Sequence, residues 1–259
     1  MSENKQDKTI RAIFLDLGGT FRIVENNVPY KTDARRRIVE LTGAEADPEA
    51  FYSLIEKRYD VYREWALQYM CEAPEPMLWT RWLAPEYDKE RVERNAEELT
   101  YQLRRAKGER VVVKNGIETV KTLVARGYKV GVISDLVGTK EIDEWLDHDG
   151  LRPYFCTVQQ SSVTMLRKPH PAIYFLALRE AHARPEESVF VGDNLTRDII
   201  GAKASGFGMT IAIAYSGVDK LRLTKENVPD GIITRFDQLL DAFPEAPRVR
   251  LDALEQRSV

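Results

Sequence analysis

Five short apolar runs in the second half of the chain alternate with amphipathic segments, and this alternation restricts the possible folds most. The strand-like runs are 128–134, 155–159, 188–192, 209–214 and 231–234. The segments with helical periodicity are 117–126, 140–148, 172–182, 197–205 and 236–243. Strands that alternate with helices indicate a mostly parallel sheet with helices on both faces. We therefore expect an α/β fold of the doubly wound type.

One further strand is predicted at residues 10–17, and it runs into the turn Asp16-Leu17-Gly18-Gly19-Thr20. After it the pattern changes to charged, aromatic-rich helical segments, at 32–41, 47–68, 77–83 and 88–107. We expect a core of residues 1–21 and 109–243, a small all-helical insertion at 22–108 and a peripheral tail at 244–259. Ligands bind beyond the carboxyl ends of the strands in such sheets, so the insertion should cover the site as a cap.

The charge balance and the apolar segments exclude several classes of partner. The chain has 38 Lys and Arg against 41 Asp and Glu, a net charge of −3, which does not favour nucleic acid as the main partner. No stretch approaches the roughly 18 apolar residues of a membrane span, and no signal peptide is recognisable. Cys71 and Cys156 are expected to be buried free thiols. These features predict a cytoplasmic protein with a small soluble substrate, and they leave the oligomeric state open.

Polar side chains fall at the predicted carboxyl ends of the strands or in the loops beside them. They are Asp16, Ser134, Lys168 and Asp193, with Asp198 one helical turn further on. Carboxylates brought together repel one another, so such a site needs cations, which Lys168 and a divalent metal would supply. Oxygen ligands favour Mg²⁺. A carboxylate nucleophile with cations around it suits an anionic electrophile, for which phosphate esters are the obvious candidates.

Four segments, taken in order along the chain, resemble the motifs of the haloacid dehalogenase superfamily. They are Asp16-Leu17-Gly18-Gly19-Thr20, the run that closes on Ser134, the segment Arg167-Lys168-Pro169-His170-Pro171, and the segment that contains Gly192-Asp193-Asn194 and Asp198. Each motif alone is weak, and the ordered set is specific. The resemblance covers nearly the whole predicted core and implies a Rossmann-like sheet with a helical cap that encloses the substrate.

The resemblance implies a nucleophile and a metal site. Asp16 would attack phosphorus and form an aspartyl-phosphate. One oxygen of Asp16, the carbonyl group of Gly18 and the carboxylate of Asp193 would coordinate Mg²⁺. The expected function is that of a Mg²⁺-dependent phosphatase that acts on a small phosphorylated molecule.

The resemblance also implies residues that hold the phosphate and support the site. Thr20 and Ser134 would bind phosphate oxygens together with backbone N–H groups of the first loop. Lys168 would balance the charge between the nucleophile and the phosphate. Asp198 would orient Lys168 or a metal-bound water, and Asn194 would support the site from the same loop.

Gly18 departs from the family pattern. Phosphatases of the superfamily have a second aspartate there, which protonates the leaving group and then activates water, and glycine can do neither. Loss of such a group typically costs about 10² to 10⁴ in rate, so slow or specialised hydrolysis is expected. Aryl and acyl phosphates should then be better substrates than alkyl phosphates, unless the cap or the substrate supplies the acid.

Four alternatives remain open at this stage. The glycine is compatible with a relative that binds a phosphorylated ligand or a protein without turnover. A phosphonate hydrolase would use a cap lysine, for which Lys31 and Lys57 are candidates. For a haloacid dehalogenase, Arg22 is the only residue of this sequence that resembles the pattern of those enzymes. A sugar kinase of the actin-like fold would place the first loop in a hairpin, with residues 21–24 as its second strand.

Overall fold

The computed structural model describes residues 9–245, and its centre is a six-stranded parallel sheet with the order β5-β4-β1-β6-β7-β8. The strands are β1 (Ala12–Leu15), β4 (Lys129–Ser134), β5 (Phe155–Gln160), β6 (Ser188–Gly192), β7 (Met209–Ile213) and β8 (Gly231–Ile233). Each strand coincides with a predicted run to within a few residues. The predicted α/β fold with a parallel sheet is confirmed. The predicted tail at 244–259 lies almost wholly outside the described residues.

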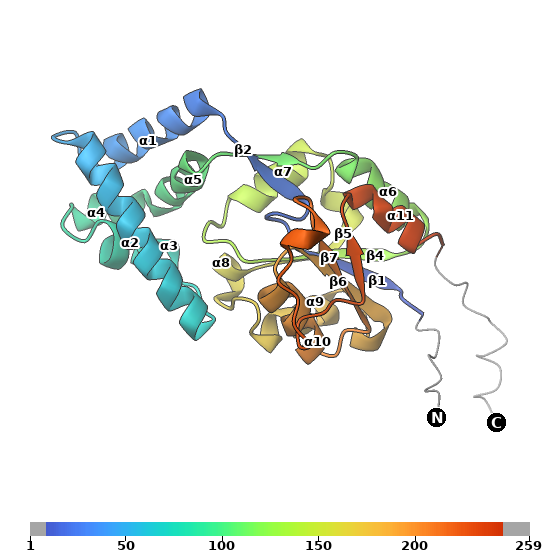
Figure 1. Cartoon of the computed structure of the whole chain (residues 1–259). Coiled ribbons are helices and arrows are strands. Elements are labelled where there is room, and N and C mark those ends of the chain that lie inside the picture. The colour runs from blue at the N-terminus through green and yellow to red at the C-terminus, as the bar shows by residue number, and fades with distance from the viewer. Residues whose placement is uncertain (1–8, 246–259) are drawn as a thin grey trace.

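Helices cover both faces of this sheet (Figure 1). Alternation along β1 shows the two faces, because Ile13 and Leu15 belong to one apolar cluster and Ala12 and Phe14 to another. The first cluster includes side chains of α6 (Gly116–Ala125), α7 (Glu141–His148) and α11 (Leu239–Ala242). The second includes side chains of α9 (Pro171–Glu180) and α10 (Gly201–Ala204). The short helices are η2 (Arg152–Tyr154), α8 (Ser161–Thr164), η3 (Pro185–Glu187), the π-helix η4 (Leu195–Ile200), η5 (Val218–Lys220) and η6 (Phe236–Gln238).

The helices between β2 and β3 gather beside the sheet around an apolar cluster of their own (Figure 1). They are α1 (Val28–Thr42), α2 (Pro48–Tyr69), α3 (Glu75–Met77), the π-helix η1 (Leu78–Leu83), α4 (Lys89–Arg94) and α5 (Ala96–Ala106). Side-chain caps fix three of the starts, since Asn27 accepts from the Tyr30 N–H at 3.1 Å, Asp47 from the Ala50 N–H at 3.0 Å and Asp88 from the Arg91 N–H at 2.7 Å. The single helix predicted at 88–107 is two helices that meet at Asn95.

A two-stranded antiparallel ribbon joins this helical part to the sheet. Its strands are β2 (Arg22–Glu25) and β3 (Glu109–Val112), with Arg22 paired to Val112. The ribbon is not among the elements predicted from the sequence. Residues 22–25 form the strand that the kinase alternative needs, but β2 pairs with β3, whereas β1 pairs with β4 and β6. The hairpin of that alternative is therefore absent.

A second connection lies at the segments 70–72 and 165–167. The N–H of Glu72 donates to the Met165 carbonyl, and the N–H of Arg167 donates to the Met70 carbonyl, both at 3.0 Å. The side chains of Glu72 and Arg167 form a buried ion pair. Ser161 donates to the same carboxylate at 2.8 Å, and the Tyr62 hydroxyl donates to its other oxygen. The helical part is thus tied to the loop just before Lys168.

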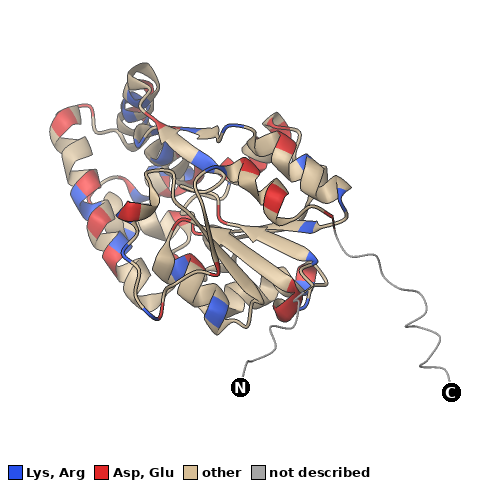
Figure 2. Cartoon of the chain, turned by 45° about the vertical axis from the view of Figure 1, so that its right-hand side comes forward, with Lys and Arg blue, Asp and Glu red and all other residues tan. Residues whose placement is uncertain are grey.

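Charged residues of both signs are interspersed over the helices, while the strands of the large sheet are mainly uncharged (Figure 2). Both cysteines are free, but the expectation that they are buried is wrong, because Cys71 is half-buried and Cys156 is exposed on the edge strand β5. Among residues 9–245, no helix combines the length and apolar character needed to cross a membrane.

Candidate active site

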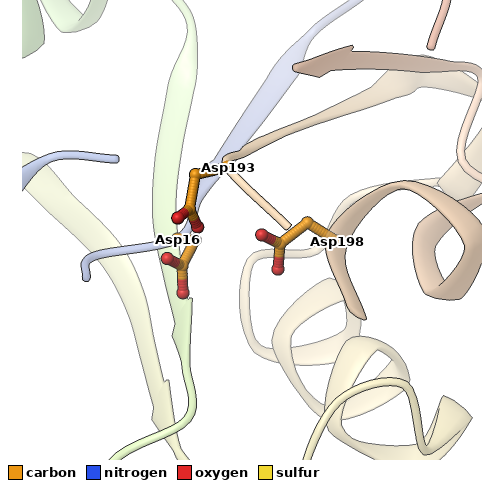
Figure 3. Close-up of side chains that lie close together, drawn as sticks. All are labelled: Asp16, Asp193 and Asp198. Atoms are coloured by element: carbon orange, nitrogen blue, oxygen red, sulfur yellow. The ribbon is translucent and has the colours of Figure 1, made fainter. Parts of the chain in front are cut away.

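Three carboxylates meet at the carboxyl end of the sheet. Asp16 directly follows β1, Asp193 directly follows β6, and Asp198 lies in the π-helix η4 that comes next. One oxygen from each lies within 4.8 Å of the others. Figure 3 shows the carboxylates of Asp16 and Asp193 close together, with Asp198 pointing toward them from the side. The parallel topology explains the meeting, because β1 and β6 are neighbours and end at the same edge.

Lys168 lies between two of these carboxylates. Its ammonium donates to Oδ1 of Asp16 and to Oδ1 of Asp198, each at 2.7 Å, and its side chain is 1% exposed. Its backbone N–H donates to the Asp135 carboxylate at 2.9 Å, which holds the loop against the end of β4. The sequence analysis had placed Lys168 beside the nucleophile, and the structure brings the two side chains into direct contact.

Burial and the neighbouring charges together shift the pKa values of the cluster. Burial raises the pKa of Asp16 above its usual value against the attraction of Lys168, and Asp198 and Asp193 add to the rise. Burial followed by repulsion from Asp198 raises the pKa of Asp193 to about 6. For Lys168, burial lowers the pKa, but the Asp16 and Asp198 carboxylates outweigh it and raise the pKa above the ordinary range.

The loop after β1 is a tight turn that brings the backbone close to Asp193. Gly19 has φ +84°, and a Cβ there would lie 2.3 Å from Oδ2 of Asp193, so only glycine allows this approach. Thr20 is buried, and its hydroxyl lies 3.5 Å from Oδ2 of Asp16, at the limit of a hydrogen bond. The Tyr215 hydroxyl donates to the Thr20 carbonyl at 2.6 Å and fixes the loop from the side of β7.

Asp198 and Asn194 have different supporting roles. Asp198 is buried, and besides Lys168 it accepts from the Asn194 N–H at 2.9 Å. The Asn194 side chain accepts from the N–H groups of Thr196 and Arg197 at 3.1 and 2.9 Å, so it caps η4. Asp198 therefore contacts Lys168 directly, whereas Asn194 shapes the turn that presents Asp198.

The donor set of the cluster fits a divalent cation. Three carboxylates face one ammonium, which leaves about two negative charges uncompensated in a partly buried site. Burial is the largest cause of the raised pKa values of Asp16 and Asp193, and repulsion between the carboxylates adds to it. Carboxylate oxygens are hard ligands that Mg²⁺ prefers. Lys168 already occupies one oxygen each of Asp16 and Asp198, so Asp193 and the free oxygen of Asp16 are the carboxylate positions open to a metal.

A cavity of about 380 Å³ opens beside the cluster, between the strand ends and the helices α2 and α5. Gly18, Gly19 and Ser134 line it on the sheet side. Ser134, the last residue of β4, is buried, and Gly18 is exposed with no atom within 4 Å of where a Cβ would be. Ser134 and Gly18 therefore both face this cavity, and their predicted roles toward phosphate and metal stay predictions.

The cavity has functional candidates that the sequence analysis missed. Most are basic: Arg63, Arg104, Lys107, Arg110, Arg167 and Arg197. Asp135 also lines it and follows Ser134 directly, so its position next to a motif was a usable signal. Arg167 and Arg197 lie within two of the motif segments, whereas the other basic residues come from distant parts of the chain that no local pattern marks. Tyr59, expected among the aromatic residues of the helical part, is buried there and also lines this cavity.

The candidate residues of the phosphonate hydrolase and the haloacid dehalogenase either lie outside the cavity or are already bound to other side chains. Lys31 is hydrogen-bonded to Asn26 at 3.2 Å on the surface, and Lys57 is exposed. Neither lysine lines the cavity beside the carboxylates. Arg22 does line it, but its guanidinium pairs with Asp149 at 2.5 Å and stacks on Trp145 at 4.3 Å. Within the described range 9–245, Lys168 is the lysine that contacts Asp16.

Comparison with known proteins gives the family. Residues 10–206 match the model of the haloacid dehalogenase-like hydrolases. The chain belongs to this family of hydrolases. A glyceraldehyde 3-phosphate phosphatase from Pyrococcus furiosus is 34% identical over 126 residues, 49% of this chain and 52% of the relative. A phosphoglycolate phosphatase from Yersinia pseudotuberculosis is 29% identical over 128 residues, 48% of this chain and 52% of that protein. The chain thus spans about half the length of the curated relatives it matches.

A solved structure within the haloacid dehalogenase-like fold covers nearly all of this chain. The 2-haloacid dehalogenase from Pseudomonas syringae pv. Tomato DC3000 aligns with a TM-score of 0.66 and 20% identity, over 91% of this chain and 98% of that one. At this identity the likeness concerns the fold alone. It extends through both the sheet and the helical part.

Proposed function

We propose that this chain is a Mg²⁺-dependent phosphatase that acts on a small phosphorylated molecule in the cytoplasm, with Asp16 as its nucleophile. The observation that carries the proposal is the contact of Lys168 with both Asp16 and Asp198, at 2.7 Å each, beside the third carboxylate of Asp193. Relatives named as phosphatases support it. We further propose that residues 22–108 form the cap and that 1–21 with 109–243 form the core.

Asp16 begins the reaction. A carboxylate oxygen of Asp16 attacks phosphorus, an Asp16 O–P bond forms, and the bond from phosphorus to the leaving oxygen breaks. Lys168 keeps Asp16 oriented, and its positive charge stabilises the charge that develops on the phosphoryl oxygens. The Ser134 hydroxyl and the N–H groups of the loop up to Thr20 hold those oxygens. Water then attacks the aspartyl-phosphate, releases phosphate and restores the Asp16 carboxylate.

Mg²⁺ would be held by Asp16, Asp193 and the Gly18 carbonyl. When bound, it neutralises the excess charge of the carboxylates and lets a dianionic phosphate approach them. Asp198 remains the partner of Lys168, and Asn194 keeps Asp198 in place through the cap of η4.

Gly18 has no side chain that could donate a proton to the leaving oxygen. The leaving oxygen departs without a proton from this position, so substrates whose leaving group is already a weak base are favoured. Aryl phosphates meet this condition, and alkyl phosphates do not. We therefore expect turnover of aryl phosphates to exceed that of alkyl phosphates.

Steady-state turnover of an aryl phosphate with and without Mg²⁺ tests the proposal. We expect Mg²⁺-dependent release of phosphate and a phosphorylated Asp16 detectable by mass spectrometry of the quenched enzyme. Absence of activity above that of the Asp16→Asn variant would contradict it. Binding of Mg²⁺ and a phosphate mimic without hydrolysis would instead support a non-catalytic relative, the alternative that Gly18 favours.

A further inference from the structure

The cavity beside the carboxylates is larger than a phosphoryl group needs. Its volume of about 380 Å³ lies in the range of pockets that enclose whole small molecules. Gly18 and Ser134 line one wall, and Tyr59 and Arg63 of α2 and Arg104 of α5 line another. A substrate whose phosphate reaches Asp16 would therefore present the rest of its structure to α2 and α5.

Positive charge dominates the lining of this cavity. Seven arginine and lysine residues face two aspartates. Four of the seven have a carboxylate partner of their own: Arg22 with Asp149, Lys107 with Glu56, Arg167 with Glu72, and Arg197 with Asp135. The three that remain are Arg63, Arg104 and Arg110, which we call the arginine wall.

Two members of the arginine wall share one carboxylate. Arg104 is 2.8 Å from Glu141, and Arg110 is 3.7 Å from the other oxygen of the same residue. The Arg104 and Arg110 side chains are only 19% and 10% exposed. Burial, and after it the charge of Arg104, lowers the pKa of Arg110 to about 10. A pair of largely buried guanidinium groups with a single carboxylate leaves one positive charge for a ligand to compensate.

Arg63 adds a second uncompensated charge. Among residues 9–245 it forms no ion pair, although Asp60 lies one turn earlier on α2. Asp60 and Arg63 are both exposed, so water screens both charges, and Arg63 contributes less to the potential in the cavity than the largely buried Arg104 and Arg110. Arg63, Arg104 and Arg110 line the cavity together with Tyr59.

We propose that the arginine wall binds a second anionic group of the substrate, a carboxylate or a further phosphate, while the first phosphate lies at Asp16. The proposal rests on the proposed phosphatase function and narrows its substrate class to molecules with two anionic ends. Guanidinium groups suit both kinds of anion because they offer paired donors in a plane.

Binding of non-hydrolysable ligands to the full-length protein tests the site without turnover. Calorimetry compares 4-carboxybenzylphosphonate with its neutral isostere 4-carbamoylbenzylphosphonate, and 1,4-xylylenediphosphonate supplies the second-phosphate arm. We expect the anionic ligands to bind about tenfold or more tightly than the amide, as a charge-assisted hydrogen bond provides. The tighter of the two anionic ligands identifies the preferred group.

The Arg63→Gln variant tests the residue, and Lys57→Gln is its matched control. Both residues are exposed and lie on α2, but Lys57 is outside the cavity, so each variant should fold and lose one positive charge. We expect Arg63→Gln to remove about tenfold of the preference for the anionic ligands and to change the affinity for the amide by less than about twofold. Lys57→Gln should leave the preference unchanged.

The outcomes separate the two proposals. Selective binding of the anionic ligands without turnover of any aryl phosphate would support the proposed anion site at the arginine wall and would contradict the proposed phosphatase function. Turnover with equal kcat/KM for 4-carboxyphenyl and 4-carbamoylphenyl phosphate, unaltered by Arg63→Gln, would overturn the arginine wall alone. Failure of all three phosphonates to bind at millimolar concentration would also overturn it.

Discussion

Arg167 and Glu72 form a buried ion pair between the helical part and the loop that carries Lys168. The Arg167 and Glu72 side chains are 8% and 0% exposed, and Glu72 also accepts from Ser161 at 2.8 Å and from Tyr62. Lys168, the next residue after Arg167, contacts Asp16. One side of this loop is therefore attached to the helices and the other to the nucleophile.

Removal of Arg167 alone should destabilise the protein strongly. Arg167→Met leaves the Glu72 carboxylate buried without its cation, a change that typically costs about 3–5 kcal/mol. Urea unfolding followed by circular dichroism measures it. The double variant Glu72→Gln, Arg167→Met removes the uncompensated charge and should recover part of the loss. Equal stability of the single and double variants would show that the ion pair does not cause the effect.

Replacement of the nucleophile should abolish turnover. Asp16→Asn keeps the size of the side chain and removes its charge, so we expect a fall in kcat of at least about 10³-fold, because no other group can form the bond to phosphorus. Asp241→Asn is the matched control, since Asp241 is an exposed aspartate of α11 that does not line the cavity. A similar loss in both variants would point to a general defect and not to the chemistry.

The sequence predicted the carboxylate cluster because its logic is topological. Asp16 and Asp193 each follow a parallel strand, Ser134 is the last residue of another, and parallel strands end at one edge. The motif order predicts that Lys168 contacts the nucleophile. It does not predict that Lys168 binds Asp16 and Asp198 at the same time, because that depends on how two loops pack. The six strands of the large sheet were predictable because each is a local apolar run.

The ribbon, the buried ion pair and the arginine wall have no local pattern in the sequence that predicts them. The strands β2 and β3 have four residues each and lie more than 80 positions apart, so neither explains the other in sequence. The ion pair of Glu72 with Arg167 joins residues 95 positions apart. Arg104 and Arg110 read as surface charge until α5 and β3 are packed against Glu141. Long-range packing, and not propensity, decides these contacts.

An aspartate at position 18 should restore acid catalysis. A Cβ at Gly18 would have no atom within 4 Å, and its φ lies outside the left-handed range, so Gly18→Asp should change the free energy of unfolding by less than about 1 kcal/mol. We expect kcat for an alkyl phosphate to rise by about 10²-fold, the lower end of what a positioned acid contributes. A fall would mean that the site works around the glycine.

The neighbouring glycine is the control for this substitution. Gly19 has φ +84°, and its Cβ would lie 2.3 Å from Asp193, so Gly19→Ala should cost about 1 kcal/mol or more and disturb Asp193. Activity should fall in Gly19→Ala for the substrates that Gly18→Asp improves. If both variants change stability and rate in the same way, the open space beside Gly18 does not explain the effect of Gly18→Asp.

Stability without divalent cations should fall as pH rises between about 4 and 6. The pKa of Asp193 rises from an ordinary 3.8 to about 6 in the folded protein, so the folded chain holds a proton in this window that the unfolded chain has lost. The contribution of this group is present below the lower value and lost above the higher one. Thermal unfolding of wild type and Asp193→Asn across this range measures it, and the variant should show a smaller decline.

Mg²⁺ should reverse this decline. The metal binds the deprotonated carboxylates, so its affinity should weaken as pH falls through about 6, the pKa of Asp193. Added Mg²⁺ should raise Tm at pH 7.5 in the wild type and have less effect at pH 5 or in Asp193→Asn. An affinity independent of pH would show that Asp193 is not a ligand.

The ribbon of β2 and β3 means that the chain leaves the sheet layer and returns to it at one place. Arg22 pairs with Val112, and Glu25 pairs with Glu109, so the departing and returning strands remain neighbours. A reverse turn of a few residues would be enough to join β2 to β3 in place of the helices. The helical part interrupts no strand of the large sheet. The helical part therefore enters and leaves the chain at one point, but Glu72 still ties it to Arg167, so any replacement of these helices would have to supply a new partner for Arg167 to keep Lys168 in place.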